Sequence, residues 1–205
     1  MKTKSIITPL VFITSILTLS SFLEGPVVEK FQVDTKASTL VWKGKKVTGE
    51  HTGNIQIASG TLTSEGKVVS KGSFEIDLTS ITVTDIQDKA SNEKLVGHLK
   101  GDDFFGVTKF PKANFVLSSI TAKSGNEYLV SGKLTIKGIT NDIQFPAVIV
   151  KDAKKITATA KIVVDRTKYD IHYKSKNFFE NLGDKAIEDN FELDLKLVAN
   201  ALAGA

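Results

Sequence analysis

Cysteine is absent from the 205 residues of the chain, and its absence excludes several kinds of site and cross-link. There can be no disulfide, no thiolate ligand for zinc and no thiol nucleophile. No cysteine is available for lipid attachment, which argues against a lipoprotein. A secreted chain without disulfides must be stabilised by its own core, and about 180 residues are enough to form one.

Histidine is scarce, and the patterns typical of enzymes are missing. His51, His98 and His172 lie in three different segments, with no H-x-H or H-E-x-x-H spacing. The chain also lacks a G-x-S-x-G elbow and the order of a P-loop. The adjacent Asp102 and Asp103 favour a turn or helix end over paired acid and base roles. We therefore predict no metal, no cofactor and no catalytic residue. The least favoured alternative is a metal-dependent hydrolase assembled from the scattered histidines.

The excess of positive charge is small. The formal net charge is +4, and the first 21 residues contribute two lysines and no acidic residue to it. A nucleic-acid-binding protein should show a concentrated basic face. Lysines instead form short groups within 43–46, 151–155 and 174–176, which we interpret as solvated turns, with contacts to an anionic head group as the alternative. No nucleic-acid partner is predicted.

One apolar run stands out, from Ile6 to Leu19. It follows Lys2 and Lys4 and precedes Ser20-Ser21, an order of basic, apolar and small residues that is typical of a secretory signal. The run is shorter than the roughly 20 residues that span a bilayer, so an uncleaved anchor is the less favoured alternative. We expect residues 1–21 to be a signal peptide and the protein to be periplasmic or secreted.

From Phe31 onward the dominant pattern is alternation of apolar and polar residues. The stretches KGSFEIDL, EYLVSGKLTIKG, KITATAKIVV and FELDLKLVA each predict an antiparallel strand with one dry face and one wet face. Many such strands favour a sandwich or a closed barrel, and closure removes exposed edges. The expected eight to nine strands are 31–34, 39–48, 53–63, 67–79, 113–122, 127–137, 142–150, 154–165 and 190–199.

Two segments interrupt the alternation. Residues 85–106 have helical composition, and Asp88 or Ser91 could cap the start of a helix there. Residues 167–189 form a long connection before the last strand, and long connections are often lids or functional loops. No interior linker marks a second domain. The expected fold is all-β, with a short helical excursion between strands and a long loop before the last strand.

The apolar faces of the strands predict the interior. The inward-facing residues on this reading are Phe74, Ile76, Phe115, Leu117, Tyr128, Val130, Leu134, Ile136, Phe145, Ile156, Ile162, Phe191, Leu193 and Leu195. Alternation leaves two interpretations open, a packed core or a space for one ligand. The small residues Gly72, Gly132, Ala158 and Ala160 on the same faces favour unfilled space.

Several motifs together resemble the YceI-like family over about residues 31–199. The strongest is GHLKGDDFFGVTKFPKANFVLSSI, with its His-Leu, Asp-Phe-Phe and Phe-Pro order. The stretches VSGKLTIKGITNDIQFP, VDTKASTLVWKGKKVTGEHTGNI and VVDRTKYDI are also similar to the family. Three features depart from its pattern: Leu95-Val96-Gly97 stands before His98, Asp170 replaces a common glycine, and the last loop, with Phe178-Phe179, is longer.

The resemblance implies an eight-stranded, antiparallel, lipocalin-like barrel that is periplasmic or secreted and binds polyisoprenoid lipids without catalysis. The inward-facing residues above would then line a tunnel for an apolar tail, and His98, Arg166 and His172 are the candidates for contacts with a head group. Leu99, Phe104 and Phe105 are expected to plug one end of the barrel. A transient membrane contact for lipid exchange and a homodimer are further expectations. A structural or partner-binding barrel with a filled core is the main alternative.

Overall fold

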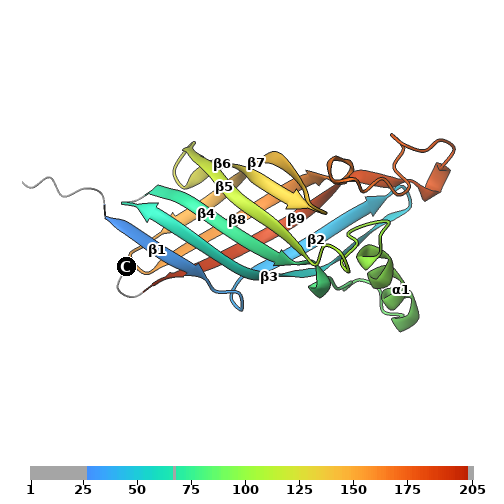
Figure 1. Ribbon diagram of the computed structural model, residues 1–205, viewed down its shortest axis with the longest axis horizontal. Coiled ribbons are helices and arrows are strands. Elements are labelled where there is room, and N and C mark those ends of the chain that lie inside the picture. The colour runs from blue at the N-terminus through green and yellow to red at the C-terminus, as the bar shows by residue number, and fades with distance from the viewer. Residues whose placement is uncertain (1–26, 67, 203–205) are drawn as a thin grey trace, which may run out of the picture.

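The computed structural model describes residues 27–66 and 68–202, which form one antiparallel β-barrel with a single α-helix (Figure 1). The predicted signal peptide, residues 1–21, lies outside the described residues. The strands are β1 (Val28–Val33), β2 (Thr39–Lys46), β3 (Gly49–Glu65), β4 (Val68–Asp77), β5 (Lys112–Ala122), β6 (Glu127–Ile136), β7 (Ile139–Lys151), β8 (Lys155–Asp165) and β9 (Ile187–Ala201). The helices are α1 (Lys89–Lys100) and the 3-10 turns η1 (Leu78–Ser80), η2 (Arg166–Tyr169) and η3 (Gly183–Lys185).

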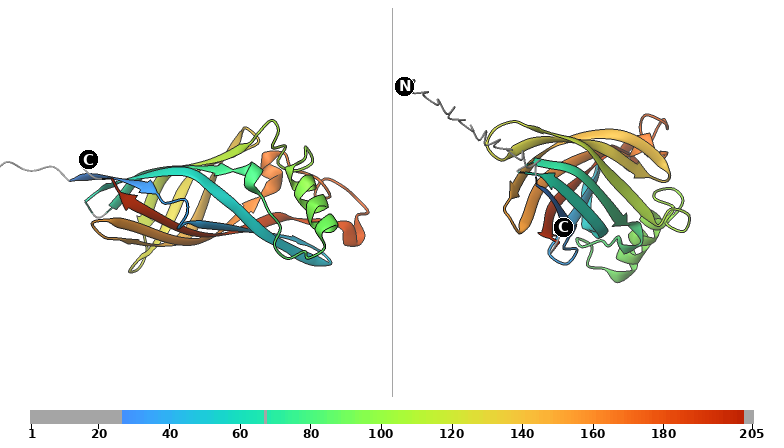
Figure 2. Two further views of the ribbon diagram at one scale, coloured as in Figure 1. Left: turned by 90° about the horizontal axis from the view of Figure 1, so that it is seen from below. Right: turned by 60° about the vertical axis from the view of Figure 1, so that its left-hand side comes forward.

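The sheet closes on itself, which confirms the predicted eight-stranded barrel. Each strand from β2 to β9 pairs with its neighbours in the order β3-β2-β9-β8-β7-β6-β5-β4, and β4 pairs with β3 to complete the ring (Figure 2). β1 and β2 together occupy one position, because both pair with β3 on one side and with β9 on the other. The turn between β1 and β2 is attached to β9, because Ser38 Oγ accepts a hydrogen bond of 3.0 Å from the Val198 N–H.

The observed strands follow the predicted ones with shifts at their ends. β3 starts at Gly49, because the β2–β3 hairpin stays paired to the Lys46–Gly49 pair. The predicted helical stretch 85–106 is helical only over α1, and Asp88 caps it by accepting a 2.9 Å hydrogen bond from the Ser91 N–H. The exposed Asp102 and Asp103 lie in the turns that follow α1, as predicted.

The two ends of the barrel differ in their connections. At the terminal end, where β1 begins and β9 finishes, the strands are joined by short turns (Figure 1). At the helix end lie the two long connections, 78–111 with α1 and 166–186 with η2 and η3. Within the described residues, none of the helices has the length and apolar composition needed to cross a bilayer.

Candidate ligand-binding cavities

Two cavities lie inside the barrel, one toward each end. The helix-end cavity encloses about 870 Å³ and the terminal-end cavity about 900 Å³, their openings included. The two cavities meet at a collar of side chains that line both: Leu40, Ile76, Leu134 and Leu193.

The terminal-end cavity has a wholly apolar wall. Every residue that lines it is Ala, Val, Leu, Ile or Phe, contributed by strands around the barrel. Several of these inward-pointing side chains are only partly buried, among them Phe74, Phe115, Leu117 and Leu195. An inward side chain that is still reachable from an internal space indicates a hollow interior rather than a filled one.

The predicted inward-facing residues all line one or both cavities, except Tyr128. Tyr128 shares their face of β6, opposite Ala147 of β7, but it lies near the β5–β6 turn beyond the cavity wall. The sequence interpretation missed lining residues on β2 and β3, including Trp42, Ile55 and Ile57. The alternation in TLVW and GNIQIASG, where apolar residues recur every second position, is the signal that could have identified them.

The small inward residues do not all create space. A Cβ on Gly132 would lie 2.3 Å from the Phe115 ring, and one on Gly72 would lie 2.9 Å from the Leu62 side chain. These two glycines accommodate neighbouring side chains, so the prediction that they leave free volume was wrong. Ala158 and Ala160, by contrast, line the terminal-end cavity.

The helix-end cavity is covered by the two long connections. Leu99, Phe104 and Phe105 line it from the first connection, and this confirms the predicted plug. Phe105 packs edge-to-face on Phe191 of β9, with ring centroids 6.3 Å apart. Ile171 lines the same cavity from the second connection.

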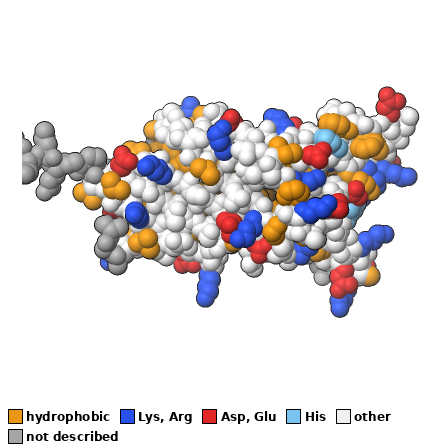
Figure 3. Space-filling model, viewed as in Figure 1, with side chains coloured by type: hydrophobic (Ala, Val, Ile, Leu, Met, Phe, Trp, Pro, Cys, Tyr) orange, Lys and Arg blue, Asp and Glu red, His pale blue; other side chains and the backbone are white. Residues whose placement is uncertain are grey.

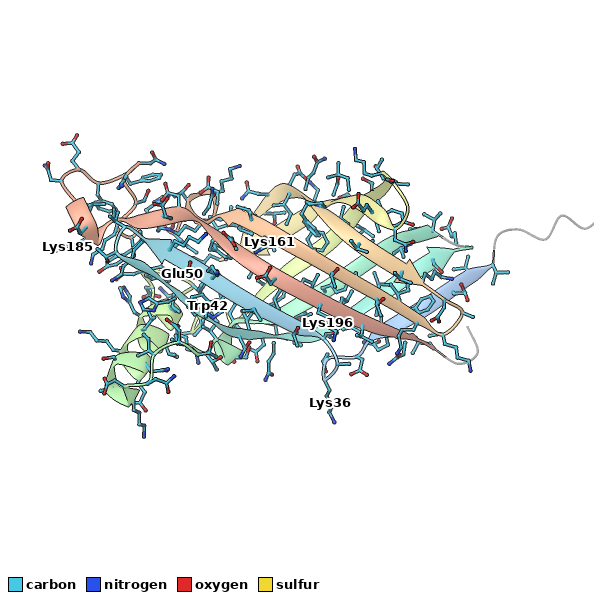
Figure 4. The ribbon with its side chains drawn as sticks, turned by 180° about the vertical axis from the view of Figure 1, so that it is seen from behind. Lys36, Trp42, Glu50, Lys161, Lys185 and Lys196 are labelled. Atoms are coloured by element: carbon cyan, nitrogen blue, oxygen red, sulfur yellow. The ribbon has the colours of Figure 1, made fainter. Side chains whose placement is uncertain are left out.

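Trp42 packs against the chain that precedes α1. Its indole Nε1 donates a 2.9 Å hydrogen bond to the Thr82 carbonyl, across Gly53 of the neighbouring strand. The Thr82 and Thr84 N–H groups also donate to the Asn54 and Thr52 carbonyls of β3. Figure 4 places Trp42 on β2, toward the end that carries α1. The first connection is therefore attached to the wall of the helix-end cavity.

Arg166 is the one cationic side chain that lines the cavities within the described part of the chain. It is buried, and its guanidinium donates to three carbonyls and one carboxylate: Ile171 O at 2.8 Å, Ile187 O at 3.1 Å, Glu188 O at 3.1 Å and Asp189 Oδ1 at 3.3 Å. Burial lowers the pKa of Arg166, and the carboxylates of Asp189 and Asp165 oppose that shift. Four of its five N–H groups hold the two flanks of the 166–186 connection together, and one Nη1 N–H has no partner among residues 27–66 and 68–202.

Neither His98 nor His172, the other two head-group candidates, lines a cavity. His98 packs edge-on against Phe104 and Tyr173, at centroid distances of 5.0 Å and 4.6 Å. Phe104 and Tyr173 are also in contact, at 5.6 Å, so this aromatic cluster joins α1 and its following turn to the 166–186 connection. His172 stacks on Phe178 of the same connection, with ring centroids 3.7 Å apart.

Comparison with known proteins adds a family to this geometry. A family model described as a YceI-like domain matches residues 31–199. A UPF0312 protein of Shewanella denitrificans is 28% identical over 95 residues, which are 46% of this chain and 47% of that protein. A UPF0312 protein of Staphylococcus aureus strain USA300 is 39% identical over 89 residues, 40% of this chain and 49% of that protein. The matched part spans about half the length of these relatives.

Two solved structures have the same architecture. BcnA of Burkholderia cenocepacia superposes with a TM-score of 0.64 at 22% identity, covering 81% of this chain and 98% of that one. A polyisoprenoid binding domain from Saccharophagus degradans, implicated in plant cell wall breakdown, gives a TM-score of 0.60 at 16% identity and covers 84% and 98%. At these identities the likeness shows the fold. The family match covers most of the chain, and the chain therefore belongs to the YceI-like family.

Proposed function

We propose that the barrel holds the apolar tail of one amphiphilic lipid, a polyisoprenoid such as a prenyl quinone or a prenyl phosphate. In this proposal residues 31–199 form a lipid-binding domain that stores or transports the lipid unchanged, in the periplasm or outside the cell. The observation that carries it is the terminal-end cavity, which has a wholly apolar wall and adjoins a second cavity through one collar of side chains.

The apolar wall selects for a particular kind of ligand. Burial of apolar surface stabilises a bound tail by about 25 cal/mol per Å² removed from water. A polar group in the terminal-end cavity would find no side-chain hydrogen-bond partner on its wall, and leaving it unpaired costs about 2–7 kcal/mol. The cavity therefore favours a long chain without polar atoms, as in an isoprenoid tail.

The head group belongs, on the same reasoning, in the helix-end cavity. The remaining Nη1 N–H of Arg166 is a donor that a quinone or phosphate oxygen can accept from. Contacts from His98 or His172 to a head group stay predictions, because neither side chain lines one of the two cavities. A homodimer and a transient membrane contact for lipid exchange also stay predictions.

Two further observations support a lipid binder over a barrel with a filled core. The inward-pointing Phe74 and Phe115 are only partly buried and line the terminal-end cavity, which favours a hollow interior. The structural relative from Saccharophagus degradans is described as a polyisoprenoid binding domain, although the low identity carries only the fold.

Native mass spectrometry of the purified protein tests the proposal. We expect a co-purified prenyl lipid, or stoichiometric loading when prenyl quinones and prenyl phosphates are offered in detergent. A straight-chain alkyl sugar of similar length serves as the control for non-specific uptake. A barrel that stays empty when offered both prenyl classes contradicts the proposal.

A further inference from the structure

Two adjacent phenylalanines project from the second long connection. Phe178 is 52% exposed and Phe179 is 50% exposed. Among the exposed large hydrophobic side chains of residues 27–66 and 68–202, these two are the only aromatic ones. The others are aliphatic and are carried mainly by the strands and their turns. Single exposed valines are normal on a protein surface, whereas exposed aromatic side chains that lie side by side are typical of an interaction site.

The chain around this pair forms an ordered turn, residues 175–179. Ser175 is fully buried, and its carbonyl accepts hydrogen bonds from the N–H groups of Phe178 at 3.2 Å and Phe179 at 3.0 Å. The Asn177 side chain donates to Asp189 Oδ2 at 2.6 Å. The ring of Phe178 stacks on His172 with an interplanar angle of 17°. The local structure therefore holds the two phenylalanines at the surface.

The turn is attached to the helix-end cavity. Ile171 precedes it, Ile187 follows it, and both line that cavity. The Ile187 N–H donates a 2.9 Å hydrogen bond to the Lys174 carbonyl, which closes the base of the connection beside the cavity wall. Figure 1 shows the 166–186 connection projecting beyond the barrel at the end that carries α1, opposite the C-terminal end of β9. A surface that the turn contacts would thus lie close to the helix-end cavity.

The charges around the turn are mixed, with lysines nearest to the phenylalanines on the N-terminal side. Lys174 and Lys176 precede the pair and no acidic residue lies between them and Phe179. Glu180 and Asp184 follow, and Lys185 comes after them. Figure 3 shows hydrophobic, basic and acidic side chains together over this end of the molecule, and Figure 4 shows Lys185 at its extremity. Aromatic residues beside lysines are the composition of elements that bind at the membrane interface.

We propose that the turn 175–179 docks the protein on a bilayer that contains anionic phospholipid. Phe178 and Phe179 insert at the boundary between head groups and acyl chains, while Lys174 and Lys176 contact the anionic head groups. This orientation brings the helix-end cavity to the membrane, where an amphiphilic lipid enters or leaves with its tail directed into the barrel. The docking deepens the proposed function and rests on it for its purpose, but its test does not depend on the ligand.

Vesicle co-sedimentation tests the docking. The chain from residue 27 to its end is mixed with vesicles of phosphatidylcholine containing phosphatidylglycerol, and partitioning is compared with that of the double variant F178S/F179S. We expect the variant to lose at least about tenfold in partition coefficient, because two half-exposed aromatic side chains no longer enter the interface. The matched control V148T/V163T changes two exposed valines on the barrel wall and should partition like the wild type. Equal thermal unfolding of the three proteins shows that the variants fold.

The second part of the vesicle experiment tests the contribution of the two lysines. K174Q/K176Q should weaken binding to vesicles with phosphatidylglycerol and reduce its sensitivity to salt. Wild-type protein that ignores the vesicles, or F178S/F179S protein that binds as the wild type does, overturns the proposal. Equal binding of the wild type to pure phosphatidylcholine overturns the anionic part of it.

Ligand loading separates this proposal from the proposed function. F178S/F179S should still take up a prenyl lipid offered in detergent micelles, since neither phenylalanine lines a cavity. A wild type that docks but never loads contradicts the proposed function alone. A wild type that loads from micelles but never docks contradicts the docking alone.

Discussion

The terminal end and the helix end of the barrel are covered by different kinds of connection. At the terminal end, short turns surround side chains that are completely inaccessible, including Phe31 and Ala199 at 0% exposure. At the helix end, the two long connections place fully buried side chains such as Ile171, at 0% exposure, next to partly buried ones such as Phe105 and Phe191. Both ends contain a cavity, so the difference between them lies in what covers it: paired strands with short turns at the terminal end, and two long connections, through which we expect a ligand to enter, at the helix end.

The largest expected effect comes from a phenylalanine at the terminal end. Phe31→Ala removes a fully buried ring and should lower the free energy of unfolding by about 3–5 kcal/mol. Phe105→Ala, the matched change at the helix end, removes a half-buried ring beside an existing cavity and should cost about 1–2 kcal/mol. Urea denaturation of both variants gives the comparison. Equal losses would contradict the expected difference between a fully buried ring and a partly buried one.

A glycine at the helix end should have the next largest effect. A Cβ on Gly53 would lie 1.8 Å from the Thr82 carbonyl oxygen and 2.7 Å from Trp42 Nε1. Gly53→Ala should therefore displace the chain before α1 and lower the free energy of unfolding by about 1–3 kcal/mol. Gly97→Ala is the control, because a Cβ there meets nothing within 4 Å and should favour α1. Unchanged stability and unchanged Trp42 fluorescence in the Gly53 variant would contradict this account.

Filling the terminal-end cavity with a larger side chain should change the affinity for long lipid tails more than the stability of the protein. Ala160→Leu adds a side chain to the cavity wall and should weaken binding of the longest prenyl tails about tenfold while sparing short ones, at about 0.8 kcal/mol per displaced CH₂. Stability should stay close to that of the wild type, since the space is free. A series of prenyl quinones of increasing chain length measures the effect. Val163→Leu, on the outer wall, is the control, and an equal loss for all chain lengths would contradict the prediction.

The smallest expected effect concerns a tyrosine in η2 at the helix end. Tyr169 is 1% exposed, and its hydroxyl has no hydrogen-bond partner among the described residues. Burial, with a smaller contribution from Asp165, raises the pKa of Tyr169 to about 12. The neutral phenol is thus favoured in the folded state, and the resulting stability is present below the ordinary pKa of 10.0 and is lost as the pH rises toward 12.

Tyr169→Phe removes both the buried hydroxyl without a partner and its titration. At neutral pH the variant should be as stable as the wild type or slightly more stable, by less than about 1 kcal/mol, because no hydrogen bond is lost. Its stability should fall less steeply than that of the wild type between pH 10 and pH 12. Denaturation curves across this range measure the difference, and parallel curves would mean that the hydroxyl does not titrate with unfolding.

Much of the strand pattern could be read from alternation. Side chains in a strand point to opposite faces with a period of two, so KITATAKIVV and FELDLKLVA identified inward residues without knowledge of their neighbours. The cap at Asp88 is equally local, because an N-cap carboxylate bonds to a backbone N–H three residues later. Asp170, where the family resemblance predicts a glycine, has a φ of 57°, a left-handed conformation that aspartate tolerates better than most residues.

Features that depend on distant partners could not be read in the same way. No local pattern shows that β1 and β2 share one barrel position, because that follows from their common pairing with β3 and β9. The sequence predicts Arg166 as a head-group contact, but it does not show that the carbonyls of Ile171, Ile187 and Glu188 converge on the same guanidinium when the 166–186 connection folds back. The missing side chain of Gly132 predicts free space in the interior, but the Phe115 ring fills that space.

Alternation and turn residues were enough to establish an all-β chain with one helical excursion, an apolar interior and a long last connection, because these properties depend on contacts between neighbours in sequence. The tertiary structure decided which interior residues leave space, which cation faces it and where Phe178 and Phe179 project. These properties depend on packing between segments far apart in the chain, and close packing allows only one arrangement of their volumes.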